Sequence, residues 1–207
     1  MTDLQRPLQQ GCETLGIDLT TVQIEQLVAY VQLLVKWNKT YNLTSVRDPA
    51  EMISRHILDS LAILPYLTGK TLLDVGTGAG LPGIPVAIAR PDITVTLLDS
   101  NAKKTRFLQQ AKAELSLTNV TVVNARIEQA NLPKFSMVTA RAFATIKDII
   151  DLAGGHCDDA GCLLLMKGTH PQDELDAIGE QFEVQDVVSL AIPGSSAERH
   201  LVHLIKT

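Results

Sequence analysis

Residues 71–85, TLLDVGTGAGLPGIP, constrain the fold of this chain more than any other part of its sequence. The short apolar run that opens this stretch ends too abruptly for a helix and predicts a buried strand. Gly76, Gly78 and Gly80 follow, and glycine permits a tight turn that brings backbone N–H groups close to a ligand. Pro82 then suits the first turn of a helix, where its missing N–H is no loss. Strand, glycine turn and helix start together predict the nucleotide-binding corner of a doubly wound α/β sheet.

An acid after the next apolar run supports this prediction. Residues 93–98 predict a second strand and lead into Asp99, roughly 20 residues beyond the glycines, where an acid can accept hydrogen bonds from both hydroxyls of a ribose. Glycine-rich turns also arise for geometric reasons alone, and the spacing of Gly78, Gly80 and Gly83 is weak evidence by itself. The glycines and the acid together predict a nucleotide-type ligand.

Asp74 bears on which nucleotide binds, because NAD and S-adenosylmethionine (SAM) share this kind of corner. It lies two residues before the first glycine, where a carboxylate can meet the cationic amino group of a methionine moiety. The pyrophosphate of NAD is anionic, and a carboxylate beside it would repel it. The sequence therefore favours SAM as the cofactor.

Residues 1–68 are expected to form an N-terminal helical extension. Thr20 and Gln23 make a capping box, and the apolar residues after it recur at helical spacing. Trp37 belongs to this apolar face and is assigned to the core rather than to base stacking. The polar segment 38–45 breaks the pattern and is expected to be a loop.

A further helix is expected from Pro49 onwards, with its apolar residues facing inward. Arg55, His56 and Asp59 lie among those apolar positions. These three residues fit a solvated helix face as well as a functional role, so the sequence leaves both interpretations open.

From residue 69 the chain alternates strands with helices, which is the pattern of a parallel sheet. At or just after the ends of five successive strands come Gly76, Asp99, Glu128, Arg141 and Lys167. The carboxyl ends of parallel strands meet at one edge of a sheet, and ligands bind outside that edge. These five residues are therefore expected to lie together.

The chain ends in two further strands, expected at 182–192 and 199–205 and joined by the turn residues 193–196. The connection is too short for a parallel crossover and permits an antiparallel pair. The predicted fold class is α/β, with a Rossmann-like, seven-stranded, mostly parallel sheet and an antiparallel C-terminal strand. Residues 69–207 are expected to form the SAM-binding domain, packed as one unit with the helical extension.

Charge and cysteine content limit the possible partners. The net charge is −5, and proteins that grip naked nucleic acid are usually basic, so any RNA function must depend on a local patch. Cys12, Cys157 and Cys162 lack a paired metal spacing and are expected to be structural thiols, with no metal site. The absence of an apolar run of about 18 residues argues against a membrane-spanning segment.

Several stretches of this sequence carry a closer resemblance to a known family. They are residues 37–45, 55–60, 74–85, 98–100, 141–143 and 198–202. In this order and spacing they resemble the RsmG (GidB) family of small-subunit ribosomal RNA guanine-N7 methyltransferases, whose fold is the class I methyltransferase fold. The resemblance implies methyl transfer from SAM to N7 of guanine 527 of 16S rRNA in the small ribosomal subunit, and a cytoplasmic location. We also expect a monomer.

The resemblance also implies roles for individual residues. Gly76 and Leu81 would line the SAM pocket, Ile127 and Glu128 would flank the adenine, and Arg141 would contact the cofactor at the edge of the active site. Asp99 matches the ribose-binding acid of the wider superfamily. Together with the reasoning above, the predicted cofactor-binding residues are Asp74, Gly76, Gly78, Leu81, Asp99, Ile127, Glu128 and Arg141.

The chemistry of guanine N7 sets what the protein must supply. N7 carries a lone pair and no proton, so no general base is required, and positioning is the expected catalytic contribution. O6 and N7 are both acceptors, and Arg141 or Lys167 could hold O6 while N7 stays free. These two are the predicted catalytic residues. The predicted RNA-binding patch comprises Lys36, Lys39, Arg47, Arg55, His56, Lys103, Lys104 and Arg199.

Two other functions use the same glycine corner. One is an NAD(P)-dependent oxidoreductase, and the other is a non-catalytic nucleotide-binding partner of the ribosome. A methyltransferase acting on protein or small molecules is closer still, because the fold alone does not define the substrate.

Overall fold

The computed structural model describes residues 4–141, 144–176 and 178–207. Its centre is a seven-stranded sheet with the strand order β3-β2-β1-β4-β5-β7-β6. The strands are β1 (Thr71–Val75), β2 (Thr94–Asp99), β3 (Val120–Asn124), β4 (Phe135–Arg141), β5 (Cys157–Lys167), β6 (Phe182–Ser189) and β7 (His200–Lys206). β7 runs antiparallel to β5 and β6, whereas the other paired strands are parallel. The predicted fold class is confirmed, including the antiparallel strand at the C-terminus.

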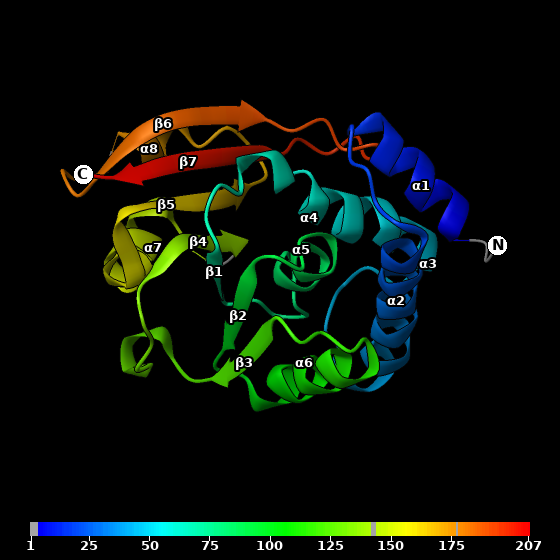
Figure 1. Cartoon of the computed structure of the whole chain (residues 1–207). Coiled ribbons are helices and arrows are strands. Elements are labelled where there is room, and N and C mark those ends of the chain that lie inside the picture. The colour runs from blue at the N-terminus through cyan, green and yellow to red at the C-terminus, as the bar shows by residue number, and fades with distance from the viewer. Residues whose placement is uncertain (1–3, 142–143, 177) are drawn as a thin grey trace.

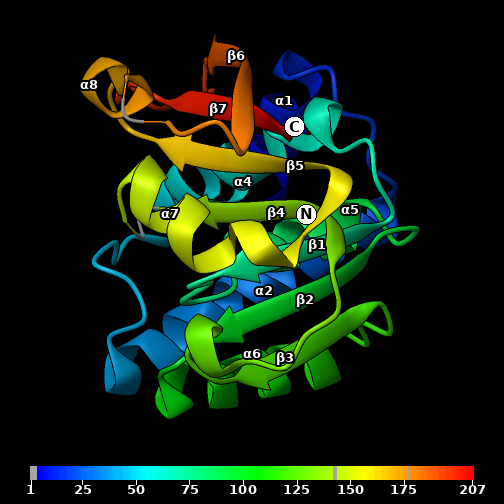
Figure 2. The same cartoon turned by 90° about the vertical axis from the view of Figure 1, so that its left-hand side faces the viewer.

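Helices cover both faces of the sheet. The first part of the chain forms α1 (Gln5–Thr14), α2 (Thr21–Tyr41), α3 (Pro49–Met52), the π-helical segment η1 (Ile53–Leu58), α4 (Asp59–Leu61) and the 3₁₀ turn η2 (Leu64–Tyr66). The rest forms α5 (Gly83–Ala89), α6 (Ala102–Glu114), η3 (Ile127–Gln129), α7 (Ile146–Ala153), η4 (Gly154–His156) and α8 (Gln172–Leu175). Figure 1 shows α1, α2, α5 and α6 on one side of the sheet and α7 on the other. In Figure 2 the arrowheads of β5, β4, β1 and β2 point to the same side, which is the carboxyl edge.

The alternation of side chains along β1 divides the core between the two faces. Leu72 is fully buried in the cluster that includes residues of α2, α5 and α6. Leu73 and Val75 are buried in the second cluster, with residues of α7. Successive side chains of a strand point to opposite faces, so Leu72 is covered on one face of the sheet and Leu73 and Val75 are covered on the other.

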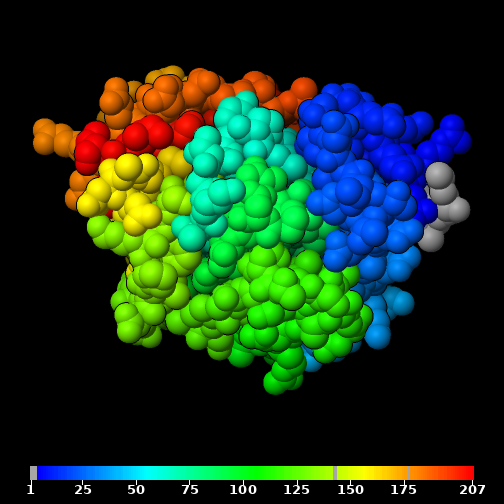
Figure 3. Space-filling model, in the orientation of Figure 1, coloured from blue at the N-terminus to red at the C-terminus, as the bar shows by residue number. Residues whose placement is uncertain are grey.

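The helical extension contributes to the same core as the sheet. Leu27, Tyr30 and Leu34 of α2 are fully buried in one cluster with Leu72 and Ile84. In the space-filling view the blue N-terminal segment lies directly against the green segment (Figure 3).

Two glutamines of α2 bond to the ends of other helices. Gln23 Nε2 donates to the carbonyl oxygens of Ile88 and Ala89 at 2.9 and 3.1 Å, at the end of α5. Gln26 Nε2 donates to Leu115 O at 3.0 Å, at the end of α6. Terminal carbonyls of a helix have no partner within it, so these bonds stabilise both helix ends. We propose that residues 1–68 and 69–207 fold as one unit for this reason.

The segment after α2 differs from the prediction. The expected loop at 38–45 was wrong in its first part, because α2 continues to Tyr41 and ends with Asn42 in the left-handed region at φ 49°. Asn38 is buried, and its Nδ2 donates to the carbonyl oxygens of Thr44 and Val46 at 3.0 and 3.3 Å. The Asn38 side chain is therefore not exposed to solvent, and its hydrogen bonds stabilise the turn that follows α2.

Candidate active site

The glycine turn after β1 has the geometry that its sequence predicts. Gly76, Gly78 and Gly80 have φ values of 65°, 61° and 92°, a region that side chains with a Cβ rarely adopt. A Cβ on Gly80 would lie 2.6 Å from Ile84 Cδ1, so this position has no space for one. The buried hydroxyl of Tyr30 donates to Ala79 O at 2.7 Å, which anchors the turn to α2.

A cavity of about 530 Å³ lies beside this turn, at the carboxyl ends of β1, β2 and β3. It brings together four of the predicted cofactor residues, Gly76, Asp99, Ile127 and Glu128. The rest of the lining is Val75, Leu98, Ser100, Asn101, Lys104, Ala125, Arg126 and Leu152. Asp74, Gly78, Leu81 and Arg141 are not among the described residues that line it.

Asp99 ties the cavity to the glycine turn and to the start of α6. Its carboxylate is buried at the end of β2, where Oδ2 accepts from Gly78 N at 2.9 Å and Oδ1 accepts from Asn101 N at 2.8 Å. Lys104 Nζ lies 3.6 Å from Oδ2. Each carboxylate oxygen can accept a second hydrogen bond, so Asp99 can still receive the hydroxyls of a ribose.

The lining of this cavity fits the nucleoside part of SAM. Leu98, Ile127 and Leu152 supply apolar surface for a base, and Asp99 supplies the acceptor for a ribose. The sequence did not predict Lys104 here, because its place in the basic run 103–106 suggested contact with RNA. Lys104 belongs to α6, and the path of this helix decides whether its side chain turns back to Asp99. A residue pattern does not reveal that path.

Asp74 lies beneath the glycine turn and is fully buried. Its Oδ2 accepts from Thr77 Oγ1 at 2.6 Å and from Gly83 N at 2.8 Å, whereas its Oδ1 has no hydrogen-bond partner among the described residues. Burial raises the pKa of this carboxyl group to about 7. An orphaned carboxylate oxygen next to the turn fits the approach of a cationic group. The predicted contact with the amino group of SAM stays a prediction.

Leu81 lies in the hydrophobic core and does not line the first cavity. Its side chain is 9% exposed and belongs to the cluster between the sheet and α2. Its predicted place in the SAM pocket stays a prediction.

A second, smaller cavity of about 210 Å³ lies at the carboxyl ends of β4 and β5. It brings together both predicted catalytic residues, and its lining is Asp59, Arg141, Met166, Lys167, Gly168 and Arg199. Lys167 Nζ donates to Glu174 Oε2 at 2.7 Å and to Ala144 O at 2.9 Å. The sequence predicted Arg141 and Lys167 at this edge, but gave no sign that Asp59 and Arg199 join them. Residues 142 and 143 of the resembling stretch 141–143 lie outside the described residues.

Arg141 is held by the helical extension. Its Nε lies 3.2 Å from Asp59 Oδ2, and its Nη2 donates to Arg55 O at 2.8 Å. Its Nη1 is buried and has no hydrogen-bond partner within residues 4–141, 144–176 and 178–207. Burial lowers the pKa of this guanidinium from its ordinary value, and Asp59 opposes that shift. Arg141 lines the second cavity, and an unpaired N–H donor of such a residue is a group that a ligand acceptor can satisfy.

The interpretation of Arg55, His56 and Asp59 as a solvated helix face was wrong for His56 and Asp59. Arg55 is exposed, but Asp59 is 1% and His56 is 6% exposed. His56 Nε2 lies 2.8 Å from Thr44 Oγ1, and burial, with a smaller contribution from Arg141, lowers the pKa of His56 to about 4. His56 is therefore neutral near pH 7 and supplies no charge to the predicted RNA-binding patch.

This environment predicts how stability changes with pH. The folded pKa of His56 lies below its ordinary value of 6.5, so the unfolded chain binds a proton that the folded chain does not. Stability is therefore lost as pH falls from about 6.5 to 4, by on the order of 3 kcal/mol from this residue. We expect His56→Gln to remove this part of the loss. Urea denaturation at a series of pH values measures it, and equal losses in both proteins would contradict the prediction.

The fold and this pair of cavities first define a class of protein. The structure is similar to a SAM-dependent methyltransferase from Aquifex aeolicus, with a TM-score of 0.59 and 18% identity, covering 80% of this chain and 97% of that one. At this identity the likeness shows the fold alone. The fold is that of the class I SAM-dependent methyltransferases.

Sequence comparison then identifies the family. The profile of GidB, rRNA small subunit methyltransferase G, matches residues 23–202. A ribosomal RNA small subunit methyltransferase G of Nitrosococcus oceani is 52% identical over 198 residues, covering 95% of this chain and 92% of that protein. The corresponding protein of Neisseria meningitidis serogroup C is 48% identical over 200 residues, covering 96% and 97%. The chain belongs to the rRNA small subunit methyltransferase G family, as its sequence resemblance predicted.

Family membership favours a SAM-dependent methyltransferase over the oxidoreductase and the non-catalytic alternatives. In the part of the chain that the structure describes, no helix is long and apolar enough to cross a membrane.

Proposed function

We propose that this chain transfers the methyl group of SAM to N7 of a guanine in small-subunit ribosomal RNA, guanine 527 of 16S rRNA as the resemblance implies. One observation carries the proposal: an acid-containing, nucleoside-sized cavity lies over β1, β2 and β3, and a cationic cavity lies over β4 and β5. The two flank the point where the strand order reverses between β1 and β4, which is where ligands bind in doubly wound sheets.

The first cavity would hold the cofactor. Asp99 would accept the ribose hydroxyls, Ile127 and Glu128 would flank the adenine, and Gly76 and Gly78 would allow close approach of the backbone. Asp74 would meet the ammonium group with its unpaired Oδ1. SAM supplies a methyl carbon attached to a cationic sulfur, and every other requirement falls on the protein.

The second cavity would hold the acceptor base. Guanine N7 needs no deprotonation, and the role of Arg141 is to donate from Nη1 to O6 so that N7 stays free. Lys167 adds positive charge beside it, although Glu174 holds its ammonium group. Bringing nitrogen, carbon and sulfur into line at near-attack distance can lower the barrier by on the order of 7 kcal/mol. The base must first leave its stack, at a cost of about a few kcal/mol.

Exposed cations on the helical extension and on α6 would bind the RNA backbone. Lys36, Lys39, Arg47, Arg55 and Lys103 are exposed, as a phosphate-binding surface requires. With a net charge of −5, the chain depends on such local positive charge for binding RNA.

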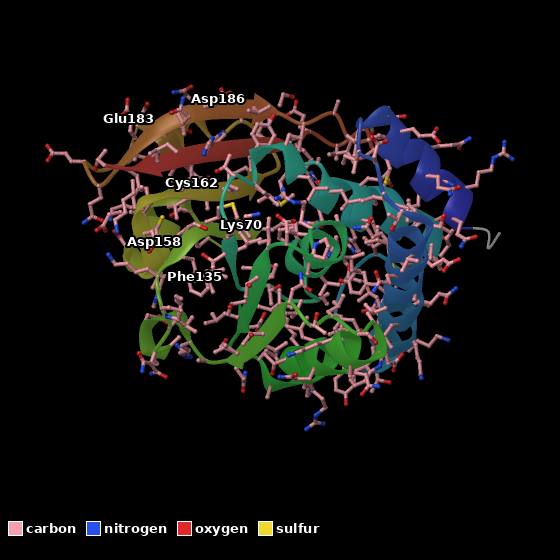
Figure 4. The ribbon with its side chains drawn as sticks, in the orientation of Figure 1. Lys70, Phe135, Asp158, Cys162, Glu183 and Asp186 are labelled. Carbon is pink, nitrogen blue, oxygen red and sulfur yellow. The ribbon has the colours of Figure 1, made fainter. Side chains whose placement is uncertain are left out.

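Charge reversal separates RNA binding from cofactor binding. We expect Lys36→Glu with Lys39→Glu to raise the KM for small subunits by about 10-fold and to leave the Kd for SAM unchanged, because phosphate contacts supply affinity without touching the first cavity. Lys134→Glu is the control, since this exposed lysine lies at the opposite edge, before Phe135 (Figure 4). Equal loss of SAM binding in the double variant would refute a purely RNA-side role.

The proposed reaction is tested by transfer of labelled methyl groups from SAM to small subunits. We expect label in 16S rRNA, and equilibrium binding of SAM in preference to NAD. Label in protein alone, or binding of NAD without SAM, would overturn the proposal.

A further inference from the structure

Asp59 lies between two arginines that come from distant parts of the chain. Its Oδ1 accepts a hydrogen bond from Arg199 Nε at 2.8 Å, and its Oδ2 lies 3.2 Å from Arg141 Nε. The carboxylate side chain is 1% exposed, against 18% for Arg141 and 22% for Arg199. The contact joins the helical extension, the end of β4 and the loop before β7 at the wall of the second cavity.

Without Asp59, this contact would hold two positive groups and no carboxylate. Arginine stays protonated in proteins, so two positive groups face one carboxylate. Like charges at short range repel more strongly in a poorly solvated site than in water. His56 adds no further positive charge, because burial lowers the pKa of its imidazole to about 4. Asp59 is therefore the group that allows Arg141 and Arg199 to lie side by side.

The same contact sets the orientation of the Arg141 guanidinium. Nε faces Asp59, and Nη2 donates to Arg55 O. Within the described residues, Nη1 is the buried nitrogen of this group that lacks a partner. Nη2 is hydrogen-bonded and Nε is ion-paired to the helical extension, so Nη1 is the nitrogen of this cavity-lining arginine that remains for a ligand acceptor.

We propose that Asp59 is a positioning residue for methyl transfer, which holds the guanidinium groups of Arg141 and Arg199 at the wall of the second cavity so that Arg141 Nη1 meets O6 of the acceptor guanine. This inference depends on the proposed function, because it requires Arg141 to act at the acceptor base. It gives the helical extension a part in the reaction itself, beyond contact with the RNA backbone.

Asp59→Asn tests the proposal, with Asp92→Asn as its control. Asp92 also bridges two cations, Lys70 and Arg90, at 2.8 Å each, but at the amino edge of the sheet, where Lys70 precedes β1 (Figure 4). A displacement of about 1 Å at a reacting group can cost on the order of 100-fold in rate. We expect kcat with small subunits to fall by about that factor in Asp59→Asn, with the KM for SAM within about threefold, and to stay unchanged in Asp92→Asn.

A double variant distinguishes positioning from general destabilisation. If Asp59 acts through Arg141, then adding Asp59→Asn to Arg141→Lys causes little further loss, because residues that act as a unit are not additive. Full additivity of the two losses would overturn the proposal. Wild-type kcat in a folded Asp59→Asn protein would also overturn it. If that variant does not fold, Asp59→Glu keeps the charge and displaces both guanidiniums, and it is expected to show the same selective loss of kcat.

A spectroscopic readout does not require the reaction. In ¹⁵N-edited NMR of the free protein, we expect the Nε–H signals of Arg141 and Arg199 to be protected from solvent exchange, and to lose that protection in Asp59→Asn but not in Asp92→Asn. Unchanged protection in Asp59→Asn would contradict the positioning role. Failure of the proposed function gives a different result from failure of this inference. Wild-type turnover in Arg141→Lys would show that Arg141 does not act at the acceptor base. Reduced turnover in Arg141→Lys together with wild-type turnover in Asp59→Asn would overturn the Asp59 inference alone.

Discussion

Arg141→Lys is expected to lower kcat for methylation of small subunits by about 100- to 1,000-fold, which is the usual cost of removing one preorganised donor from a reacting site. The loss follows from the shape of the side chain. Arginine reaches Asp59 with Nε and Arg55 O with Nη2 while Nη1 stays free. Lysine keeps the charge but carries it on one nitrogen, which has no planar fork to meet all three directions at once.

Steady-state kinetics with purified subunits measures this loss. Arg90→Lys is the matched control, because Arg90 also pairs with an aspartate, Asp92, but at the other edge of the sheet. We expect that control to retain wild-type turnover. If Arg141→Lys retains more than half of wild-type kcat, Arg141 does not act on the acceptor base.

Asp74→Asn is expected to stabilise the fold above neutral pH while weakening the binding of SAM. The folded pKa of Asp74 is raised from 3.8 to about 7 by burial, so between these values the folded chain holds a proton that the unfolded chain has lost. Stability therefore falls as pH rises through this window, by on the order of 4 kcal/mol in total. Asparagine carries no charge and removes this fall.

The stability difference between Asp74→Asn and wild type should therefore grow with pH from about 4 to about 7. Urea denaturation at several pH values gives this difference, and isothermal titration with SAM gives the affinity. We expect the Kd for SAM to rise by at least about 10-fold, because the variant cannot pair with a cationic ammonium group. A difference in stability that is constant with pH would contradict the raised pKa of Asp74.

The elements of the sheet could be predicted from sequence because they depend on local patterns. The run before Gly76 and the acid at Asp99 mark strand ends, and both lie where expected. The capping box of Thr20 and Gln23 correctly marked the start of α2, where the Thr20 side chain accepts from Gln23 N. Its end was missed, since Asn38 reads as a loop residue and is in fact buried with its amide bonded inside the turn.

The site was predicted only as far as strand ends reveal it. Gly76, Asp99, Ile127 and Glu128 line one cavity as a group, and Arg141 and Lys167 line another. Their separation into two cavities could not be read from a list of strand ends. The contact of Asp59 with Arg199 joins residues 140 positions apart, and no periodicity links them. Such a pairing is set by how the helical extension crosses the sheet.

The central claim is that a guanine N7 in small-subunit rRNA receives the methyl group, and mapping the modified nucleotide tests it most directly. Small subunits lacking the modification are incubated with SAM and the protein, and the extracted 16S rRNA is then cleaved chemically at N7-methylguanine. The account predicts one new, SAM-dependent cut, at guanine 527. Methyl incorporation into the RNA with no such cut, or with the methyl group on another atom, would contradict it.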